Sequence, residues 1–149
     1  MKIVVDADAC PVKELIKQTA LKYNISVIMV CDTSHIIKDD YCEVITVDKF
    51  ADSADIYLIN LVEIGDLVIT QDYGVAALAL GKKAYAISNN GMEFNDENMD
   101  KLLFERFLGK KVRRAGKRTK GPSKRTETDD KNFIDGLTKI LDKISIDNK

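Results

Sequence analysis

Short apolar runs alternate with stretches of helical spacing along the first 87 residues, and this alternation limits the folds open to the chain. The runs favour β structure, whereas the stretches between them repeat apolar residues every three to four positions. The expected strands cover about 3–5, 25–30, 44–47, 67–70 and 84–87, and the expected helices about 11–23, 52–64 and 73–80. This order predicts an α/β fold with a doubly wound, mainly parallel five-stranded sheet covered by helices on both faces.

Two more helices are expected after the turn at Asn89-Asn90-Gly91, at about 96–108 and 129–145. A chain of 149 residues with 45% hydrophobic residues can bury one core, so we expect a single domain over residues 1–149. No apolar stretch approaches the roughly 20 residues of a membrane span, and the N-terminus reads as a strand instead of a signal peptide. The sequence therefore predicts a cytoplasmic protein without a membrane partner.

The charge is divided sharply along the chain. The total is −1, but residues 110–126 hold nine Lys and Arg and no acid, which leaves 14 basic and 24 acidic residues elsewhere. Gly116, Gly121 and Pro122 disfavour regular structure there, so we expect a basic loop. A segment of +9 beside a body of −10 indicates a polyanionic partner such as RNA, a dock on the protein's own surface, or a solvated loop.

The cysteines and the single histidine offer little for catalysis. Cys10, Cys31 and Cys42 form no Cys-x-x-Cys pair, so neither a disulfide framework nor a zinc cage is indicated. Cys31 and Cys42 are expected to be small buried residues. Cys10 could begin a helix, but His35 is the chain's one histidine and lies in a polar stretch, so a cysteine nucleophile lacks its usual base.

Aspartates follow several of the expected strands, and those after two of the strands are the main candidates for a site. Asp6 and Asp8 come after the first strand, and Asp72 comes two residues after the strand at 67–70. In open α/β sheets, ligands bind where strands hand over to helices. Carboxylates gathered at one edge repel one another unless a cation or shared protons hold them, so this pattern predicts a site for a hard divalent cation.

Three further aspartates, Asp52, Asp55 and Asp66, are expected to have different roles. Asp52 and Asp55 share a face at the start of the second helix, where one can cap the helix and Asp55 is the better candidate ligand. Asp66 precedes its strand, which puts it roughly 20 Å from Asp72 at about 3.3 Å per residue, so a structural role is expected. Thr70 and Gln71 could orient Asp72 or a phosphate by hydrogen bonds.

Taken together, Asp6-Ala7-Asp8-Ala9-Cys10-Pro11, the Asp52-x-x-Asp55 helix start, the stretch 65–72 and Gly121-Pro122 resemble the YaiI/YqxD family over essentially the whole chain. That family is grouped with PIN- and NYN-like domains, which are Mg²⁺- or Mn²⁺-dependent ribonuclease folds. The resemblance implies that Asp6, Asp55 and Asp72 match the acids of the PIN centre, with Asp8 and Asp52 as supporting ligands. Gly74 stands where a further acid often follows in PIN domains, so the number of bound cations stays open.

The leading hypothesis is a phosphodiesterase that cuts RNA with Mg²⁺ or Mn²⁺. Its catalytic residues would be Asp6, Asp8, Asp55 and Asp72, which with Asp52 would form the metal site. Backbone phosphates would be bound by basic residues of the 110–126 segment, namely Arg113, Arg114, Lys117, Arg118, Lys120, Lys124 and Arg125. A phosphatase of the haloacid dehalogenase type, using Asp6 and Asp8, and a non-catalytic RNA-binding module are the alternatives, and a homo-oligomer stays open.

Overall fold

Six strands lie within the described residues, one more than the sequence predicts. We analysed a computed structural model that describes residues 1–149 except 9, 33–37, 49–53, 115, 117–123 and 148–149. The strands are β1 (Ile3–Asp6), β2 (Val27–Asp32), β3 (Glu43–Val47), β4 (Leu67–Ile69), β5 (Tyr85–Ile87) and β6 (Glu93–Phe94). They form one sheet in the order β3-β2-β1-β4-β5-β6, in which all pairs are parallel except β5 with β6.

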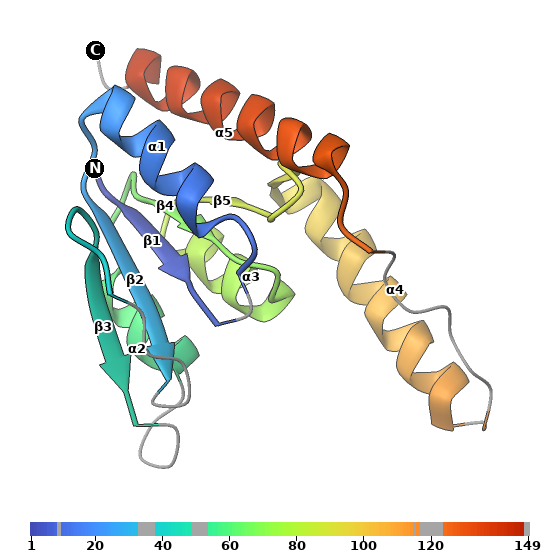
Figure 1. Ribbon diagram of the computed structural model, residues 1–149. Coiled ribbons are helices and arrows are strands. Elements are labelled where there is room, and N and C mark those ends of the chain that lie inside the picture. Colours follow the sequence, from blue (N-terminus) through green and yellow to red (C-terminus); the bar gives the residue numbers. More distant parts are fainter. Residues whose placement is uncertain (9, 33–37, 49–53, 115, 117–123, 148–149) are drawn as a thin grey trace.

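Within the described residues there are five helices, namely α1 (Lys13–Tyr23), α2 (Ala54–Leu61), α3 (Tyr73–Gly81), α4 (Asp96–Arg114) and α5 (Glu127–Asp147). α1 and α5 cover one face of the sheet and α2 and α3 cover the other (Figure 1), as the alternating pattern predicts. Within β1, Ile3 and Val5 belong to a core shared with α1 and α5, whereas Val4 belongs to a second core shared with α2 and α3. This alternation follows from the two-residue period of a strand, so the prediction of a doubly wound α/β sheet is confirmed.

The structure corrects the prediction at three places beyond the turn at Gly91. The short antiparallel β6 makes the sheet six-stranded instead of five-stranded. α4 continues to Arg114, so residues 110–114 are helical and the expected basic loop does not begin at 110. α5 is longer than expected at both ends. None of the helices within the described residues is long and apolar enough to cross a membrane.

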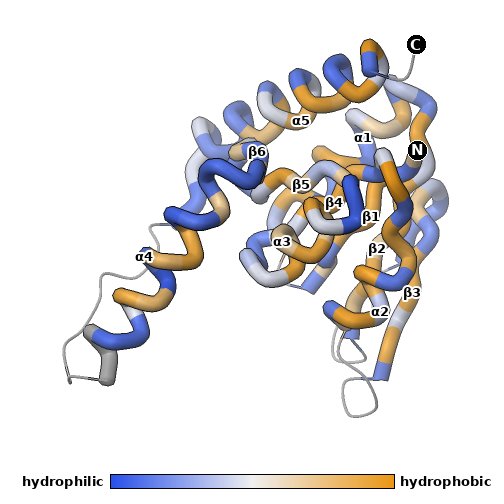
Figure 2. Tube along the Cα trace, turned by 180° about the vertical axis from the view of Figure 1, so that it is seen from behind, coloured by the Kyte–Doolittle hydropathy of each residue, from blue (hydrophilic) through white to orange (hydrophobic). Residues whose placement is uncertain are grey.

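α4 packs beside α3 over its first half, where Met99 is buried and Leu102 contacts the same core as α3. Its second half extends away from the sheet (Figures 1 and 2). Four large apolar side chains of this helix are exposed, namely Leu103, Phe104, Phe107 and Leu108. The helix therefore presents one face to the body and another to solvent.

Asp66 joins β1 to the turn before β4 at the edge of the sheet opposite to Asp72. Its carboxylate is buried and accepts the Lys2 backbone N–H at 3.0 Å, the Lys2 Nζ at 2.6 Å and the Glu63 backbone N–H at 2.8 Å. These contacts tie the start of β1 to the turn before β4. The expected structural role of Asp66 is confirmed.

Candidate functional site

The predicted ligands Asp6, Asp55 and Asp72 come from three elements that meet at one edge of the sheet. Asp6 is the last residue of β1, and Asp72 follows β4, which pairs with β1 in parallel. Asp55 lies in the first turn of α2, the helix that leads back to the start of β4. Parallel strands end at the same edge, which explains why Asp6 and Asp72 share it.

Asp6 is the electrostatic centre of this edge. Its pKa is raised to about 6, chiefly by burial and also by the negative charges of Asp55, Asp8 and Asp72, while the hydrogen bond from Thr70 lowers it. The pKa of Asp55 is also raised, first by burial and then by Asp72 and Asp8. The structure therefore brings these four carboxylates within electrostatic reach of one another. Asp52, the fifth predicted ligand, lies outside the described residues.

A single buried hydroxyl links two of these acids. The Thr70 Oγ1 donates to the Asp6 Oδ2 at 2.9 Å and accepts the Asp72 backbone N–H at 3.0 Å. Thr70 is only 1% exposed, so water does not compete for either bond. This residue fixes the distance between the end of β1 and the start of α3, and the expected hydrogen-bonding role of Thr70 is confirmed.

Asp8 and Asp72 are held by backbone donors. The Asp72 Oδ1 caps α3 by accepting the N–H groups of Gly74 and Val75 at 2.8 and 3.2 Å. The Asp8 carboxylate accepts the Asp32 N–H at 3.3 and 3.1 Å. Among the described residues, no three His, Cys, Asp or Glu side chains form a ready-made metal site. The donors are hard carboxylates that repel one another, so their chemistry fits Mg²⁺ or Mn²⁺.

Two alternative chemistries are less well supported here. In the phosphatase hypothesis Asp66 would be the further acid beside Asp6 and Asp8, but its carboxylate is bound to Lys2 at the opposite edge of the sheet. For Cys10, burial raises the pKa of the thiol, which disfavours the reactive thiolate. Cys31 and Cys42 are buried, as expected, and all three thiols are free. His35 lies outside the described residues.

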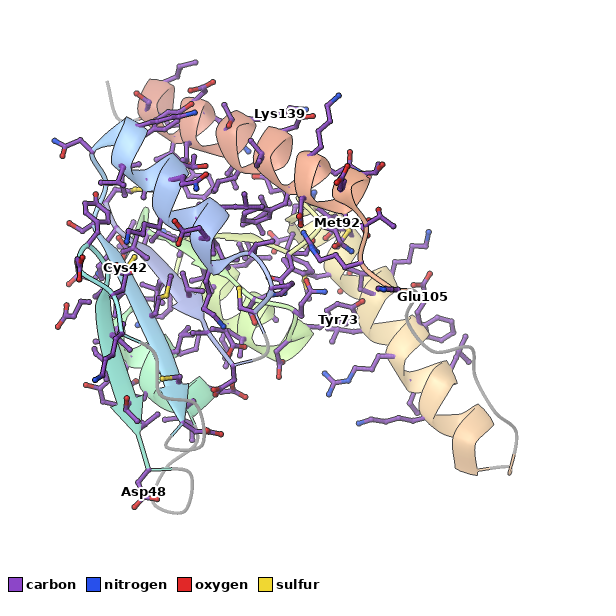
Figure 3. The ribbon with its side chains drawn as sticks, in the orientation of Figure 1. Cys42, Asp48, Tyr73, Met92, Glu105 and Lys139 are labelled. Atoms are coloured by element: carbon purple, nitrogen blue, oxygen red, sulfur yellow. The ribbon has the colours of Figure 1, made fainter. Side chains whose placement is uncertain are left out.

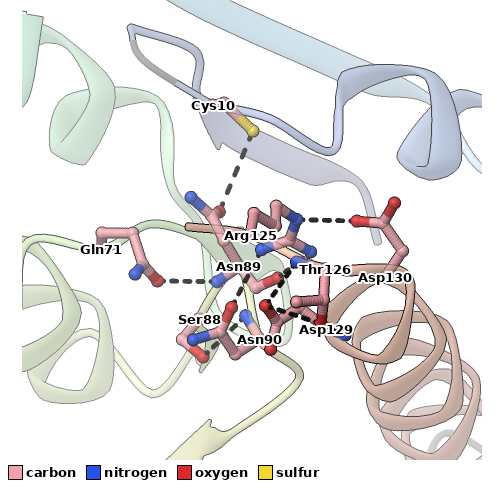
Figure 4. Close-up of polar contacts among 9 residues, drawn as sticks. All are labelled: Cys10, Gln71, Ser88, Asn89, Asn90, Arg125, Thr126, Asp129 and Asp130. Carbon is pink, nitrogen blue, oxygen red and sulfur yellow. Dashed lines mark hydrogen bonds and ion pairs between the residues drawn. The ribbon is translucent and has the colours of Figure 1, made fainter. Parts of the chain in front are cut away.

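The end of the basic segment is bound to the body of the protein through Arg125 (Figure 4). The Arg125 guanidinium donates to the Asp130 Oδ1 at 2.7 Å, the Asn90 Oδ1 at 2.9 Å and the Asn89 carbonyl at 2.9 Å. The Asn89 N–H in turn donates to the Gln71 Oε1 at 2.7 Å, next to Asp72 in the chain. Arg125 therefore holds the loop after β5 by hydrogen bonds, and its guanidinium is engaged within the protein.

Of the other residues predicted to contact RNA, the structure describes the side chain of Lys124 alone. Arg113 and Arg114 belong to α4, but their side chains lie outside the description, as do residues Lys117, Arg118 and Lys120. Lys124 is exposed. Their role in binding RNA stays a prediction.

A residue that the sequence analysis did not single out lies beside the carboxylates. Arg106 of α4 lines a cavity of about 240 Å³ together with Gln71, Asp72 and Tyr73. The basic residues of 110–126 form a cluster without acids, whereas Arg106 lies between Glu105 and Phe107 just before this cluster. Its helical spacing from Met99 and Leu102 is the signal that could have placed it on the face of α4 turned toward the body.

Comparison with known proteins gives a consistent family match. The model of a family described as the uncharacterised YaiI/YqxD family matches residues 4–143. A UPF0178 protein of Ruminiclostridium cellulolyticum is 58% identical over 137 residues, which cover 92% of this chain and 90% of that protein. A UPF0178 protein of Alkaliphilus oremlandii is 54% identical over 142 residues, covering 95% and 92%.

Among solved structures, the crystal structure of Rae1 (YacP) from Bacillus subtilis covers 78% of this chain and 84% of its own. The sequence identity is 19% and the TM-score is 0.43. A likeness at this level carries no conclusion about the site.

Proposed function

We propose that this chain, which belongs to the YaiI/YqxD family, is a divalent-metal-dependent phosphodiesterase that cuts RNA. The observation that carries the proposal is the state of Asp6, a carboxylate whose pKa is raised to about 6 by burial and by three acidic neighbours at one edge of the sheet. Ionising such a group near neutral pH is costly, and a cation at this edge would remove the cost.

Asp6, Asp55 and Asp72 would hold the cation, with Asp8 and Asp52 in support. When bound, Mg²⁺ or Mn²⁺ lowers the pKa of a water molecule and neutralises charge on a phosphate. Other residues of the chain hold these carboxylates in place. Thr70 keeps Asp6 and Asp72 together, and the α3 cap fixes the orientation of the Asp72 carboxylate. No histidine base is needed for this chemistry.

The direct test uses the wild-type protein and a labelled single-stranded RNA. With millimolar Mn²⁺ we expect cleavage and a rise in melting temperature, because the cation binds the folded state and relieves the repulsion there. Excess chelator should abolish both effects. RNA that is bound equally with and without Mn²⁺ and never cut would instead identify a non-catalytic RNA-binding module, and trapping of a phosphoaspartate on Asp6 would identify the phosphatase.

The basic segment supplies a second test, of RNA binding alone. Changing Arg113, Arg114, Lys117 and Arg118 together to Gln should weaken binding of single-stranded RNA and flatten its salt dependence. Each lost phosphate contact should reduce the log–log salt slope by roughly 0.7. Binding is measured by fluorescence anisotropy over a range of salt concentrations. Lys38→Gln and Lys131→Gln, which also remove positive charge but lie outside the segment, serve as controls.

An unchanged affinity and slope in the fourfold variant would show that these four residues do not contact the phosphates. The proposed cleavage would then have to find its substrate through other surfaces.

A further inference from the structure

The cavity between α3 and α4 opens beside the candidate metal centre. Asp72 belongs to both, since its carboxylate raises the pKa of Asp6 and its side chain also lines the cavity. The volume of about 240 Å³ is suited to part of a ligand such as one nucleotide. Its lining combines a cation, an aromatic ring, an amide and a carboxylate. These are the groups that recognise a phosphate and a base.

Arg106 is presented to this cavity by the packing of α4. It follows Met99 by seven residues and Leu102 by four, and both of these contact the body, so the same stripe of the helix carries Arg106 toward α3. Within the described part of the chain, Arg106 forms no hydrogen bond or ion pair, although Asp72 lines the same cavity. A guanidinium and a carboxylate that face one cavity without touching leave room for a group between them.

Tyr73 forms the aromatic wall. It is the first residue of α3 and lies on the side of the body that faces α4 (Figure 3). Its ring packs edge-to-face on Phe94, with centroids 6.0 Å apart and planes at 65°. This contact holds the ring in place. Beside it, Gln71 is oriented by the hydrogen bond that its Oε1 accepts from Asn89.

We infer that this cavity is a subsite for one unpaired nucleotide of the RNA, adjacent to the phosphate that is cut. Arg106 binds the phosphate of that nucleotide through its guanidinium fork, and the base stacks on Tyr73. This inference rests on the proposed function for the identity of the ligand. It adds the requirement that the RNA be single-stranded at this position, because a base within a duplex cannot leave its stack to meet the ring without a cost.

The inference is tested by binding, separately from cleavage. The probe is a fluorescein-labelled hexauridylate, measured by anisotropy with the full chain in the presence of chelator. Arg106→Ala should weaken binding about tenfold and reduce the log–log salt slope by roughly 0.7, the value for one lost phosphate contact. Tyr73→Leu should weaken binding at least fivefold without changing the slope, because stacking carries no charge, and Tyr73→Phe should restore it.

Lys101→Ala is the matched control. Lys101 is an exposed cation on the same helix, and its Nζ lies 4.0 Å from a carboxylate oxygen of Glu105, so its removal changes the charge of α4 but not the cavity. Equal weakening by Lys101→Ala and Arg106→Ala would overturn the inference, since it would show only a general effect of charge. An unchanged affinity in Arg106→Ala would overturn it as well.

The outcome is distinguishable from failure of the proposed function. If the wild-type protein never cuts RNA but Arg106 and Tyr73 still govern binding of the hexauridylate, the subsite stands and the catalytic proposal falls. If the protein cuts RNA with Mn²⁺ and neither variant changes binding, the catalytic proposal stands and the subsite is refuted.

Discussion

Replacing Asp6 with asparagine should lower metal-dependent RNA cleavage by at least about 100-fold, because even groups behind the direct ligands cost roughly 10- to 100-fold when they are removed. The same change should remove most of the rise in melting temperature caused by Mn²⁺. Asparagine keeps the size and one oxygen of the side chain but loses the charge that attracts the cation. Initial cleavage rates and thermal unfolding with and without Mn²⁺ measure both effects.

Without metal, Asp6→Asn should stabilise the protein at neutral pH. The folded-state pKa of Asp6 is about 6, above the ordinary value of 3.8, so the folded protein binds the proton more tightly than the unfolded chain does. The stability of the wild type should therefore fall as the pH rises from about 4 to 6, and the variant should lack this fall. After allowance for solvent screening, the difference at pH 7 should be about 1–2 kcal/mol.

Asp66→Asn is the matched control, because it also removes one buried carboxylate but at the opposite edge of the sheet. Its three hydrogen bonds hold Lys2 and Glu63, so the variant should be less stable by about 1–3 kcal/mol. Its response to Mn²⁺ should be retained. If calorimetry finds that both variants lose Mn²⁺ affinity equally, the cation does not bind at the Asp6 edge.

Gly136→Ala should destabilise the protein by about 3 kcal/mol, because the new methyl group has no room and two backbones would have to separate. Gly136 of α5 lies against Gly91 in the turn before β6, and a Cβ atom there would meet the Gly91 carbonyl, with the Gly91 Cα only 2.7 Å away. For a chain of this size, the melting temperature should drop by roughly 10 °C. Urea unfolding gives the free energy directly.

Gly81→Ala provides the comparison for Gly136→Ala. Gly81 is the last residue of α3, and a Cβ atom there would have nothing within 4 Å. Alanine favours helix over glycine by roughly 0.5–1 kcal/mol, so this variant should be as stable as the wild type or slightly more so. A similar loss of stability in both variants would mean that the effect at Gly136 is not one of close packing.

The shared edge of Asp6 and Asp72 could be predicted from sequence because it depends on strand direction alone. Each acid follows an apolar run, and parallel strands put their carboxyl ends together. The same reasoning separated Asp66 from Asp72, since one precedes the strand and the other follows it. Thr70 could be predicted as a hydrogen-bonding residue because its side chain is polar in an otherwise apolar strand.

Several features of the second half of the chain could not be predicted from sequence, because they depend on packing between residues that are distant in the chain. β6 has two residues and exists only because β5 offers an open edge. Arg125 carries no local sign that distinguishes it from its basic neighbours, and its role appears only when α5 is docked beside Asn89 and Asn90. Helical spacing could place Arg106 on the same face of α4 as Met99 and Leu102, but the position of this face beside α3 depends on contacts between residues distant in the sequence.

The strand order also bears on how the chain matures during synthesis. β1 pairs with β2 on one side and with β4 on the other, so its first partner is complete at Asp32 but its second only at Ile69. At about 5–20 residues per second, the ribosome needs roughly 2–7 s to make the segment between them. Throughout that interval the nascent protein carries an apolar strand with one open edge. A neighbouring nascent chain could pair with that edge, so a chaperone that covers it during this stage of translation would prevent such pairing.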